Sequence, residues 1–244
     1  MKAIILAAGR GSRMKRLTEQ RPKCLVQLHG KALLDWQLDA LRKSGIKQIA
    51  IVTGYKRELL TNRGLVEFYN SHWSKTNMVA SLACAKEWLK TDECIVSYSD
   101  IFYSSAVVEL LIESQAPLAL TYDQNWLDLW TQRFGDPLID AETFLLNKDS
   151  TILEIGKKPK SLDQIQGQYI GLLKFTPSGW AEIDKIISGL SPEVSANIHM
   201  TDILQKVIEA GRVKIKGIPF SDRWGEVDSE KDLLFLVAKI TTKI

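Results

Sequence analysis

The chain has 244 residues, of which 45% are hydrophobic and 25% charged, and its formal net charge is +3. This composition is typical of a soluble globular protein, and so small a net charge argues against coating of nucleic acid. The sequence shows no signal peptide, no apolar stretch near the roughly 18 residues of a membrane span, and no cysteine or histidine spacing of a disulfide framework or zinc site, so we expect a cytoplasmic protein.

The first predicted element is a short apolar strand, Ala3 to Ile5, that breaks into a loop of small residues. The loop reads L-A-A-G-R-G-S-R-M from Leu6 and continues after a short gap to Pro22-Lys23. Small residues expose backbone N–H groups to a close phosphate chain, and arginines and lysines in the loop add positive charge. The loop therefore predicts a nucleotide site. Its nucleotide-binding candidates are Leu6, Ala7, Ala8, Gly9, Arg10, Gly11 and Ser12.

Two better-known phosphate loops do not fit this stretch. The dinucleotide fingerprint needs a third glycine where Met14 stands, and a P-loop needs Gly-Lys-Ser/Thr where Lys23 is flanked by Pro22 and Cys24. The remaining pattern resembles the signature of nucleotidyltransferases that activate phosphorylated sugars and alcohols. An ordinary strand-to-helix turn with a solvated basic face is the alternative.

The rest of the chain alternates between predicted strands and helices, which indicates a mostly parallel sheet. We expect helices at 32–45, 56–62, 77–89, 106–112, 179–187, 200–210 and 232–240. We expect strands at 49–53, 66–69, 94–98, 118–122, 144–146, 152–155, 169–175 and 213–218, with 144–146 and 152–155 as a hairpin. Residues 123–142 lack a clean period and predict an irregular substrate loop.

These elements predict one α/β domain with a doubly wound, mostly parallel sheet of the Rossmann-like nucleotidyltransferase type. A small antiparallel extension is expected on the acceptor side. We divide the chain into a nucleotide-binding half (1–122), an acceptor-binding half (123–228) and a C-terminal helix (229–244).

Two aspartates are predicted to hold a metal ion. Nucleotidyl transfer brings two phosphate anions together, and Mg²⁺ on carboxylates neutralises their charge. Asp100 directly follows the strand 94–98, and Asp228 alternates with Glu226 on a short strand, so we expect Mg²⁺ on Asp100 and Asp228. Alternatively, Asp100 merely ends a strand and Asp228 caps a helix.

The motifs together resemble the CTP-dependent cytidylyltransferases for phosphocholine and phosphoglutamine. They are the first loop with Pro22-Lys23, T-N-M-V-A-S at 76–81, Ser99-Asp100, Gly171 in Y-I-G-L, and Trp224 to Asp228. This resemblance implies CTP as donor, Lys23 and Arg13 as catalytic residues at the phosphates, and Asn77 and Ser81 near the base. A helix cap is the alternative role for Asn77, and one helix start accommodates both roles.

The predicted acceptor site combines aromatic rings with charges of both signs, which suits an acceptor that carries an ammonium and a carboxylate. The stretch from Trp126 to Glu142 resembles the phosphoglutamine enzymes of bacterial capsule modification more than the phosphocholine enzymes. The acceptor-binding candidates are Trp126, Trp130, Arg133, Glu142, Lys157, Tyr169 and Trp224. Alternatively, the tryptophans are core residues and Arg133 forms a surface ion pair.

The resulting hypothesis is CMP transfer from CTP to phosphoglutamine, or next to phosphocholine, with release of pyrophosphate, for cell-surface polysaccharide modification. Two alternatives stay open: a hexose-1-phosphate nucleotidyltransferase that uses UTP or dTTP, and a non-catalytic nucleotide-binding module. The sequence leaves the oligomeric state open.

Overall fold

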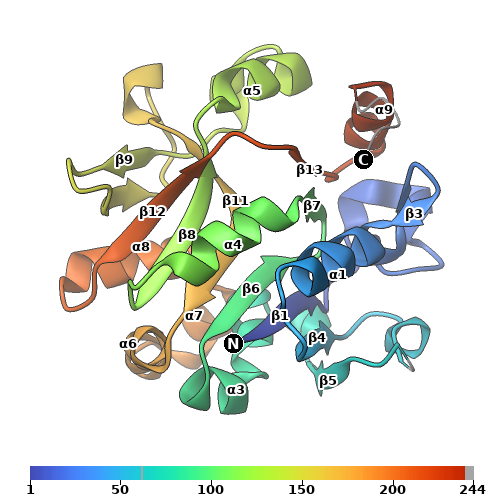
Figure 1. The fold of residues 1–244 in the computed structure, drawn as a ribbon, viewed down its shortest axis with the longest axis horizontal. Helices are drawn as coiled ribbons and strands as arrows, with labels where there is room; N and C mark the ends of the chain where they lie inside the picture. Colours follow the sequence, from blue (N-terminus) through green and yellow to red (C-terminus); the bar gives the residue numbers. More distant parts are fainter. Residues whose placement is uncertain (62, 240–244) are drawn as a thin grey trace.

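The computed structural model describes residues 1–61 and 63–239, which fold around a seven-stranded sheet (Figure 1). The strand order is β12-β8-β11-β6-β1-β4-β5. Its strands are β1 (Lys2–Ala7), β4 (Ile49–Thr53), β5 (Val66–Tyr69), β6 (Cys94–Tyr98), β8 (Leu118–Asp123), β11 (Gln168–Phe175) and β12 (Ile215–Phe220). Within this sheet β11 runs antiparallel to β6 and β8, while the other neighbours pair in parallel. The expected mostly parallel sheet is confirmed.

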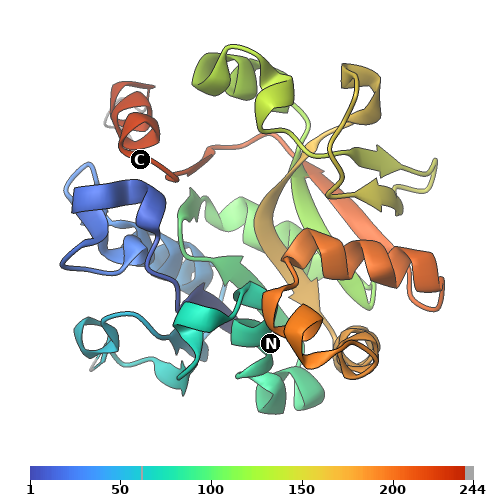
Figure 2. The same cartoon turned by 180° about the vertical axis from the view of Figure 1, so that it is seen from behind.

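Helices cover both faces of the sheet, which explains why β1, β4 and β8 are near-continuous apolar runs. One face packs against α1 (Leu33–Lys43) and α4 (Ser105–Glu113). The opposite face, seen in Figure 2, packs against α2 (Met78–Ala83), α3 (Lys86–Thr91), α6 (Pro177–Ser188), α7 (Pro192–Asn197) and α8 (Met200–Ala210). The two-sided cover is the doubly wound arrangement expected from the sequence.

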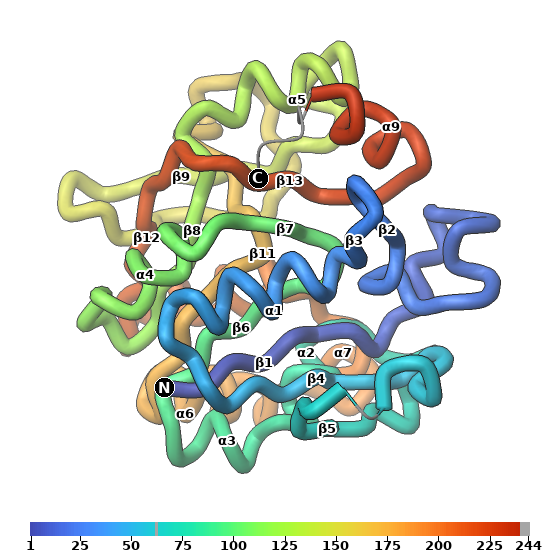
Figure 3. The backbone as a smooth tube through the Cα atoms, turned by 45° about the vertical axis from the view of Figure 1, so that its right-hand side comes forward, coloured from blue at the N-terminus to red at the C-terminus, as the bar shows by residue number. Residues whose placement is uncertain are grey.

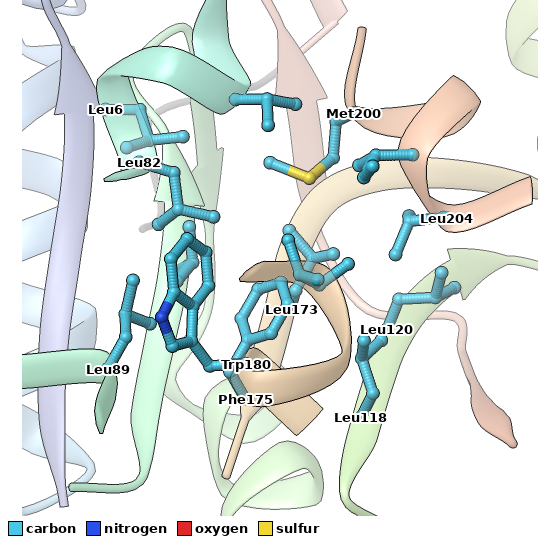
Figure 4. Close-up of a cluster of buried hydrophobic side chains, with 14 of the residues drawn as sticks. Leu6, Leu82, Leu89, Leu118, Leu120, Leu173, Phe175, Trp180, Met200 and Leu204 are labelled. Carbon is cyan, nitrogen blue, oxygen red and sulfur yellow. The ribbon is translucent and has the colours of Figure 1, made fainter. Parts of the chain in front are cut away.

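The larger core cluster gathers around Trp180 of α6, which is fully buried (Figure 4). Its ring meets the ring of Phe175 edge to face, with centroids 6.5 Å apart. Leu82 and Leu89, from α2 and α3, belong to the same cluster. Because α2 is anchored here, its first residues are held rigidly at the carboxyl end of the sheet.

Three two-stranded sheets surround the main sheet. They are β2 (Gln27–Leu28) with β3 (Lys31–Ala32), β7 (Ile101–Tyr103) with β13 (Trp224–Glu226), and β9 (Phe144–Leu146) with β10 (Ile152–Ile155), all antiparallel. The β9–β10 pair confirms the predicted hairpin. Figure 3 shows α9 (Glu230–Lys239) beside β2 and β3, where Leu236 and Leu28 share a small apolar cluster.

Several predicted elements differ from the structure. The predicted helix 77–89 divides into α2 and α3, because Cys84 and Ala85 lie between them with Ala85 at φ −95° and ψ 16°. The helix expected at 56–62 is a 3₁₀ turn, Arg57–Leu59, and residue 62 lies outside the described residues. Residues 240–244 of the predicted C-terminal helix lie outside them too. Sequence reasoning missed α7 and β7.

The irregular loop expected over 123–142 is wrong, because it contains α5 (Trp126–Phe134) and a 3₁₀ turn, Pro137–Ile139. Trp126, Trp130 and Arg133 form the buried face of α5 at helical spacing. The buried arginine interrupts the apolar pattern that would have shown this helix in the sequence.

The two predicted halves share one sheet, since β11 from the second half lies between β6 and β8. Among the described residues, every helix is too short or too polar to span a membrane.

Candidate active site

The ammonium group of Lys23 lies between two carboxylates. Its Nζ atom is 2.8 Å from Oδ2 of Asp100 and 2.5 Å from Oδ1 of Asp228. Nη2 of Arg13 lies 3.0 Å from the same oxygen of Asp228. Burial alone would lower the pKa of Lys23, but Asp100 and Asp228 outweigh it and raise that pKa. Lys23 therefore keeps its positive charge between the two carboxylates.

The first loop places Lys23 through Gly11. Gly11 has φ 70°, which favours glycine, and a Cβ there would lie 2.9 Å from Cβ and from Cδ of Lys23. The lysine stem thus passes directly over the glycine. Pro22 sets the chain at φ −60° immediately before the 3₁₀ turn Lys23–Leu25. A side chain at Gly11 would push Lys23 away from both aspartates.

Strand pairing brings the two aspartates together across 128 residues of chain. Asp100 lies in the turn between β6 and β7, and Asp228 lies just beyond β13. β7 and β13 pair with Ile101 opposite Glu226, and the Val227 N–H donates to the Asp100 carbonyl at 2.9 Å. The short strand was expected to include Asp228, but β13 ends at Glu226. Asp228 nevertheless lies beside Asp100, as predicted, since both contact Lys23.

Asp100, Glu226 and Asp228 form a carboxylate cluster in which one oxygen of each lies within 4.8 Å of the others. Oδ1 of Asp100 is buried and has no hydrogen-bond partner among the described residues. Burial, with Asp228 and Asp100 nearby, raises the pKa of Glu226, while the charges of Arg133 and Lys23 oppose that rise. Oxygen ligands and an unpaired buried oxygen fit a hard divalent cation, so these residues suit a divalent metal.

A cavity of about 200 Å³ lies between the first loop and the start of α2. Among the predicted residues, its lining includes Leu6, Ala8, Gly9, Gly11, Arg13, Lys23, Asn77, Ser81 and Asp100. Sequence reasoning assigned no role to the remaining lining residues, which are Trp73, Thr76, Met78, Tyr98 and Ser99. The cavity joins the phosphate loop to a helix start, as a nucleotide site requires.

Three predicted nucleotide-binding residues lie elsewhere. Ala7 points to the opposite face of the sheet and belongs to the core cluster under α1, because neighbouring strand residues alternate. Arg10 is exposed, with its guanidinium carbon 5.8 Å from the ring centre of Tyr55. Ser12 is exposed at the start of the 3₁₀ turn Ser12–Thr18.

Asn77 is the N-cap of α2, which is the alternative role expected for it from the sequence. Its Oδ1 accepts a hydrogen bond from the Met78 N–H at 2.9 Å, and its Nδ2 donates to the Asn197 carbonyl at 3.2 Å. Asn77 also lines the nucleotide-side cavity. Asn77 therefore caps α2 and lines this cavity at the same time.

A second cavity, of about 250 Å³, adjoins the first, since Arg13, Met78 and Tyr98 line both. Its lining includes the predicted acceptor residues Trp130, Glu142 and Tyr169 and the carboxylates of Asp140, Glu226 and Asp228. Gln168, His199, Met200 and Thr201 complete it. Burial raises the pKa of Glu142. Two cavities thus meet beside the lysine and the carboxylate cluster.

Four other predicted acceptor residues do not line this second cavity. Arg133 is buried and paired with Glu226 and Asp232. Trp126 packs in an apolar cluster with Trp130, and Nε1 of Trp224 donates a hydrogen bond to Asp123 at 2.9 Å. Lys157 is exposed and pairs with Glu154 at 2.7 Å. The alternative reading of core tryptophans therefore describes Trp126 best. Arg133 forms an ion pair, but in the interior rather than on the surface.

Two adjoining cavities, with a lysine and a carboxylate cluster where they meet, fit the site of a nucleotidyltransferase. A family model described as "MobA-like NTP transferase domain" matches residues 3–141, and the chain belongs to this family. The expected class of enzyme and its fold are thereby confirmed.

Individual relatives agree with this membership. The chain is 37% identical to the CTP:phosphoglutamine cytidylyltransferase of Campylobacter jejuni, over 98% of this chain and 100% of the relative. It is 32% identical to the choline-phosphate cytidylyltransferase of Streptococcus pneumoniae, over 63% of this chain and 67% of the relative. A crystal structure of a putative glucose-1-phosphate thymidylyltransferase from Bacillus anthracis superposes with a TM-score of 0.78 at 19% identity, covering 100% of this chain and 98% of that one, which shows the shared fold.

Proposed function

We propose that the protein transfers CMP from CTP to phosphoglutamine and releases pyrophosphate. The main support is that two cavities meet beside Lys23, Asp100 and Asp228. The chain also resembles a phosphoglutamine cytidylyltransferase over nearly its whole length. An oxygen of the acceptor phosphate attacks the α-phosphorus of CTP. A new P–O bond forms, the bond to the β-phosphate bridge breaks, and pyrophosphate leaves with the electron pair.

The residues around Lys23 would lower the repulsion between the reacting anions. Lys23 and Arg13 carry positive charge at the point where both cavities meet, so they would donate to phosphate oxygens of donor and acceptor. Asp100 and Asp228, with Glu226 beside them, would hold Mg²⁺, which supplies further neutralisation of the triphosphate. Asn77 and Ser81 would lie beside the base.

The lining of the second cavity supports an acceptor with polar groups at its far end. Asp140 and Glu142 are carboxylates that suit an ammonium group. Nε1 of Trp130 is a buried donor without a hydrogen-bond partner among the described residues. Phosphoglutamine offers oxygen acceptors for such a donor beyond its phosphate, whereas phosphocholine ends in methyl groups. Phosphoglutamine is therefore the better partner for this cavity.

The surrounding predicted residues would support the acceptor cavity from behind. The rings of Trp224 and Trp126 each lie 6.2 Å from the ring of Trp130, centre to centre. Arg133 would act through Glu226, to which it is paired. Lys157 points to solvent and carries no role in this proposal.

Pyrophosphate release tests the proposed reaction. CTP, UTP and dTTP are each combined with Mg²⁺ and with phosphoglutamine, phosphocholine or glucose 1-phosphate. We expect release with CTP and phosphoglutamine. Release only from UTP or dTTP with glucose 1-phosphate would support the hexose reading, and silence in every combination would support a non-catalytic module. We further propose a cytoplasmic reaction, where nucleoside triphosphates are available, that supplies cell-surface polysaccharide modification.

A further inference from the structure

Asn70 follows strand β5 and is buried beside the nucleotide-side cavity, with 5% of its surface exposed. Its side-chain Oδ1 accepts a hydrogen bond from the backbone N–H of His72 at 3.0 Å. A backbone N–H can only donate, so this contact fixes which end of the amide is oxygen and which is nitrogen. The NH₂ group of Asn70 must therefore point the other way.

Both hydrogens of that NH₂ group are used. Nδ2 donates to Oγ1 of Thr76 at 3.0 Å and to Oγ of Ser81 at 3.0 Å. Thr76 and Ser81 both line the nucleotide-side cavity. Asn70 is thus a donor behind two hydroxyl groups of residues that line this cavity.

The protons of the two hydroxyl groups have partners as well. Thr76 donates to the His72 carbonyl at 3.0 Å, and Ser81 donates to the Asn77 carbonyl at 3.5 Å. A hydroxyl has one proton and two lone pairs. With its proton and one lone pair occupied, each hydroxyl keeps one lone pair. The cavity wall therefore presents hydrogen-bond acceptors at these two positions.

Cytosine carries an exocyclic amino donor at the position where uracil carries a carbonyl acceptor. Resting on the proposed nucleotide site, we propose that Asn70 selects cytosine by holding Thr76 and Ser81 as acceptors. The amino group of cytosine completes a hydrogen bond with such a wall, whereas the carbonyl of uracil meets lone pairs and leaves its own desolvated oxygen unpaired. Asn70 is thus a positioning residue that acts through the two hydroxyl groups.

The experiment measures dissociation constants of CTP and UTP by calorimetry, with Mg²⁺ and without acceptor. Wild-type protein should bind CTP more tightly. Asn70→Leu removes both donors and frees the hydroxyl protons to rotate, so the preference for CTP should fall about tenfold, the worth of one such hydrogen bond. Ser81→Ala and Thr76→Val should weaken CTP binding more than UTP binding. Thr131→Val, whose hydroxyl bonds to the Leu127 carbonyl on α5, is the matched control and should keep the wild-type ratio.

Each outcome bears on the proposal. Equal binding of CTP and UTP by wild type overturns it, and so does a wild-type ratio in folded Asn70→Leu protein. If Asn70→Leu fails to fold, Ser81→Ala decides, and an unchanged ratio in that variant overturns the proposal. A shifted ratio without pyrophosphate release from any acceptor would leave this inference standing while the proposed reaction fails. If wild-type protein releases pyrophosphate but Asn70→Leu keeps the wild-type ratio of CTP to UTP binding, the proposed reaction stands and the inference on Asn70 fails.

Discussion

Arg133 on α5 and Glu226 on β13 form a buried ion pair, with Nη1 and Oε2 3.2 Å apart. Nε of Arg133 lies 3.0 Å from Oδ1 of Asp232, and Oδ2 of Asp232 accepts a hydrogen bond from the Ser229 N–H just before α9. Glu226 belongs to the carboxylate cluster. One guanidinium therefore links α5 and α9 to the site and compensates two acidic groups that would otherwise be buried unpaired.

Replacing Arg133 should damage stability and metal binding together. Arg133→Met leaves Glu226 and Asp232 without their partner, so we expect a loss of about 3–5 kcal/mol of unfolding free energy and a higher Mg²⁺ requirement. Urea unfolding and rates against Mg²⁺ concentration measure the two effects. Arg57→Met, which breaks the more exposed pair with Glu67, is the control and should cost little. Equal losses in the two variants would contradict this role of Arg133.

Gln37 on α1 should position the turn that carries Asp100. It is fully buried, and its Nε2 donates to the carbonyls of Tyr98 at 2.8 Å and Ile101 at 2.5 Å, on either side of the turn. Gln37→Met removes both bonds, so kcat should fall about tenfold and the half-saturating Mg²⁺ concentration should rise. Gln115→Met, on the surface after α4, serves as control. A normal Mg²⁺ requirement in Gln37→Met would remove Gln37 from this role.

Asp100→Asn should make the enzyme demand more metal, because an anionic ligand with an otherwise unpaired buried oxygen becomes neutral. The measurement is the initial rate across a Mg²⁺ series, with a depressed rate expected throughout. Asp39→Asn changes an exposed aspartate that pairs with Lys31 and should match wild type. Identical rates of wild type and Asp100→Asn at low Mg²⁺ would refute the metal role.

Stability at acid pH should depend on Asp232. Burial alone would raise the pKa of this carboxyl group, but the hydrogen bond and charge of Arg133 lower it below the usual value of 3.8. The unfolded chain then binds the proton more readily, so this contribution is present above about pH 4 and is lost as pH falls through the folded pKa. Between about pH 5 and about pH 3, the unfolding free energy of Asp232→Asn should therefore fall less steeply than that of the wild-type protein. Parallel curves for the two proteins would rule out this linkage.

The features that could be predicted from the sequence are those that depend on the local pattern of apolar and turn residues. The strands β4, β5, β6, β9 and β10 have the expected bounds because short apolar runs end at turn residues. The first loop, Asp100 and Asp228 stand out in the sequence as site candidates because loops and strand ends carry sites in open α/β sheets, and the structure places Lys23, Asp100 and Asp228 together. Pairing of β7 with β13 then brings these distant pieces together.

Other features depend on contacts that local pattern does not show. Trp73 and Tyr98 line the first cavity only because Trp73 packs against Tyr55 and Tyr98 ends β6 beside β11. Asn70 and Gln37 look like ordinary polar residues in the sequence. Their partners lie on other segments, so their roles follow from tertiary geometry rather than from spacing.

A competition between two acceptors tests the proposed function most directly. Equal concentrations of phosphoglutamine and phosphocholine are mixed with CTP, Mg²⁺ and the wild-type protein, and the CDP-linked products are quantified by mass spectrometry at early times. The ratio of products gives the ratio of kcat/KM values. The proposed function predicts that the CDP-linked glutamine product dominates, with little CDP-choline. Predominant CDP-choline, or no CDP-linked product at all, would contradict it.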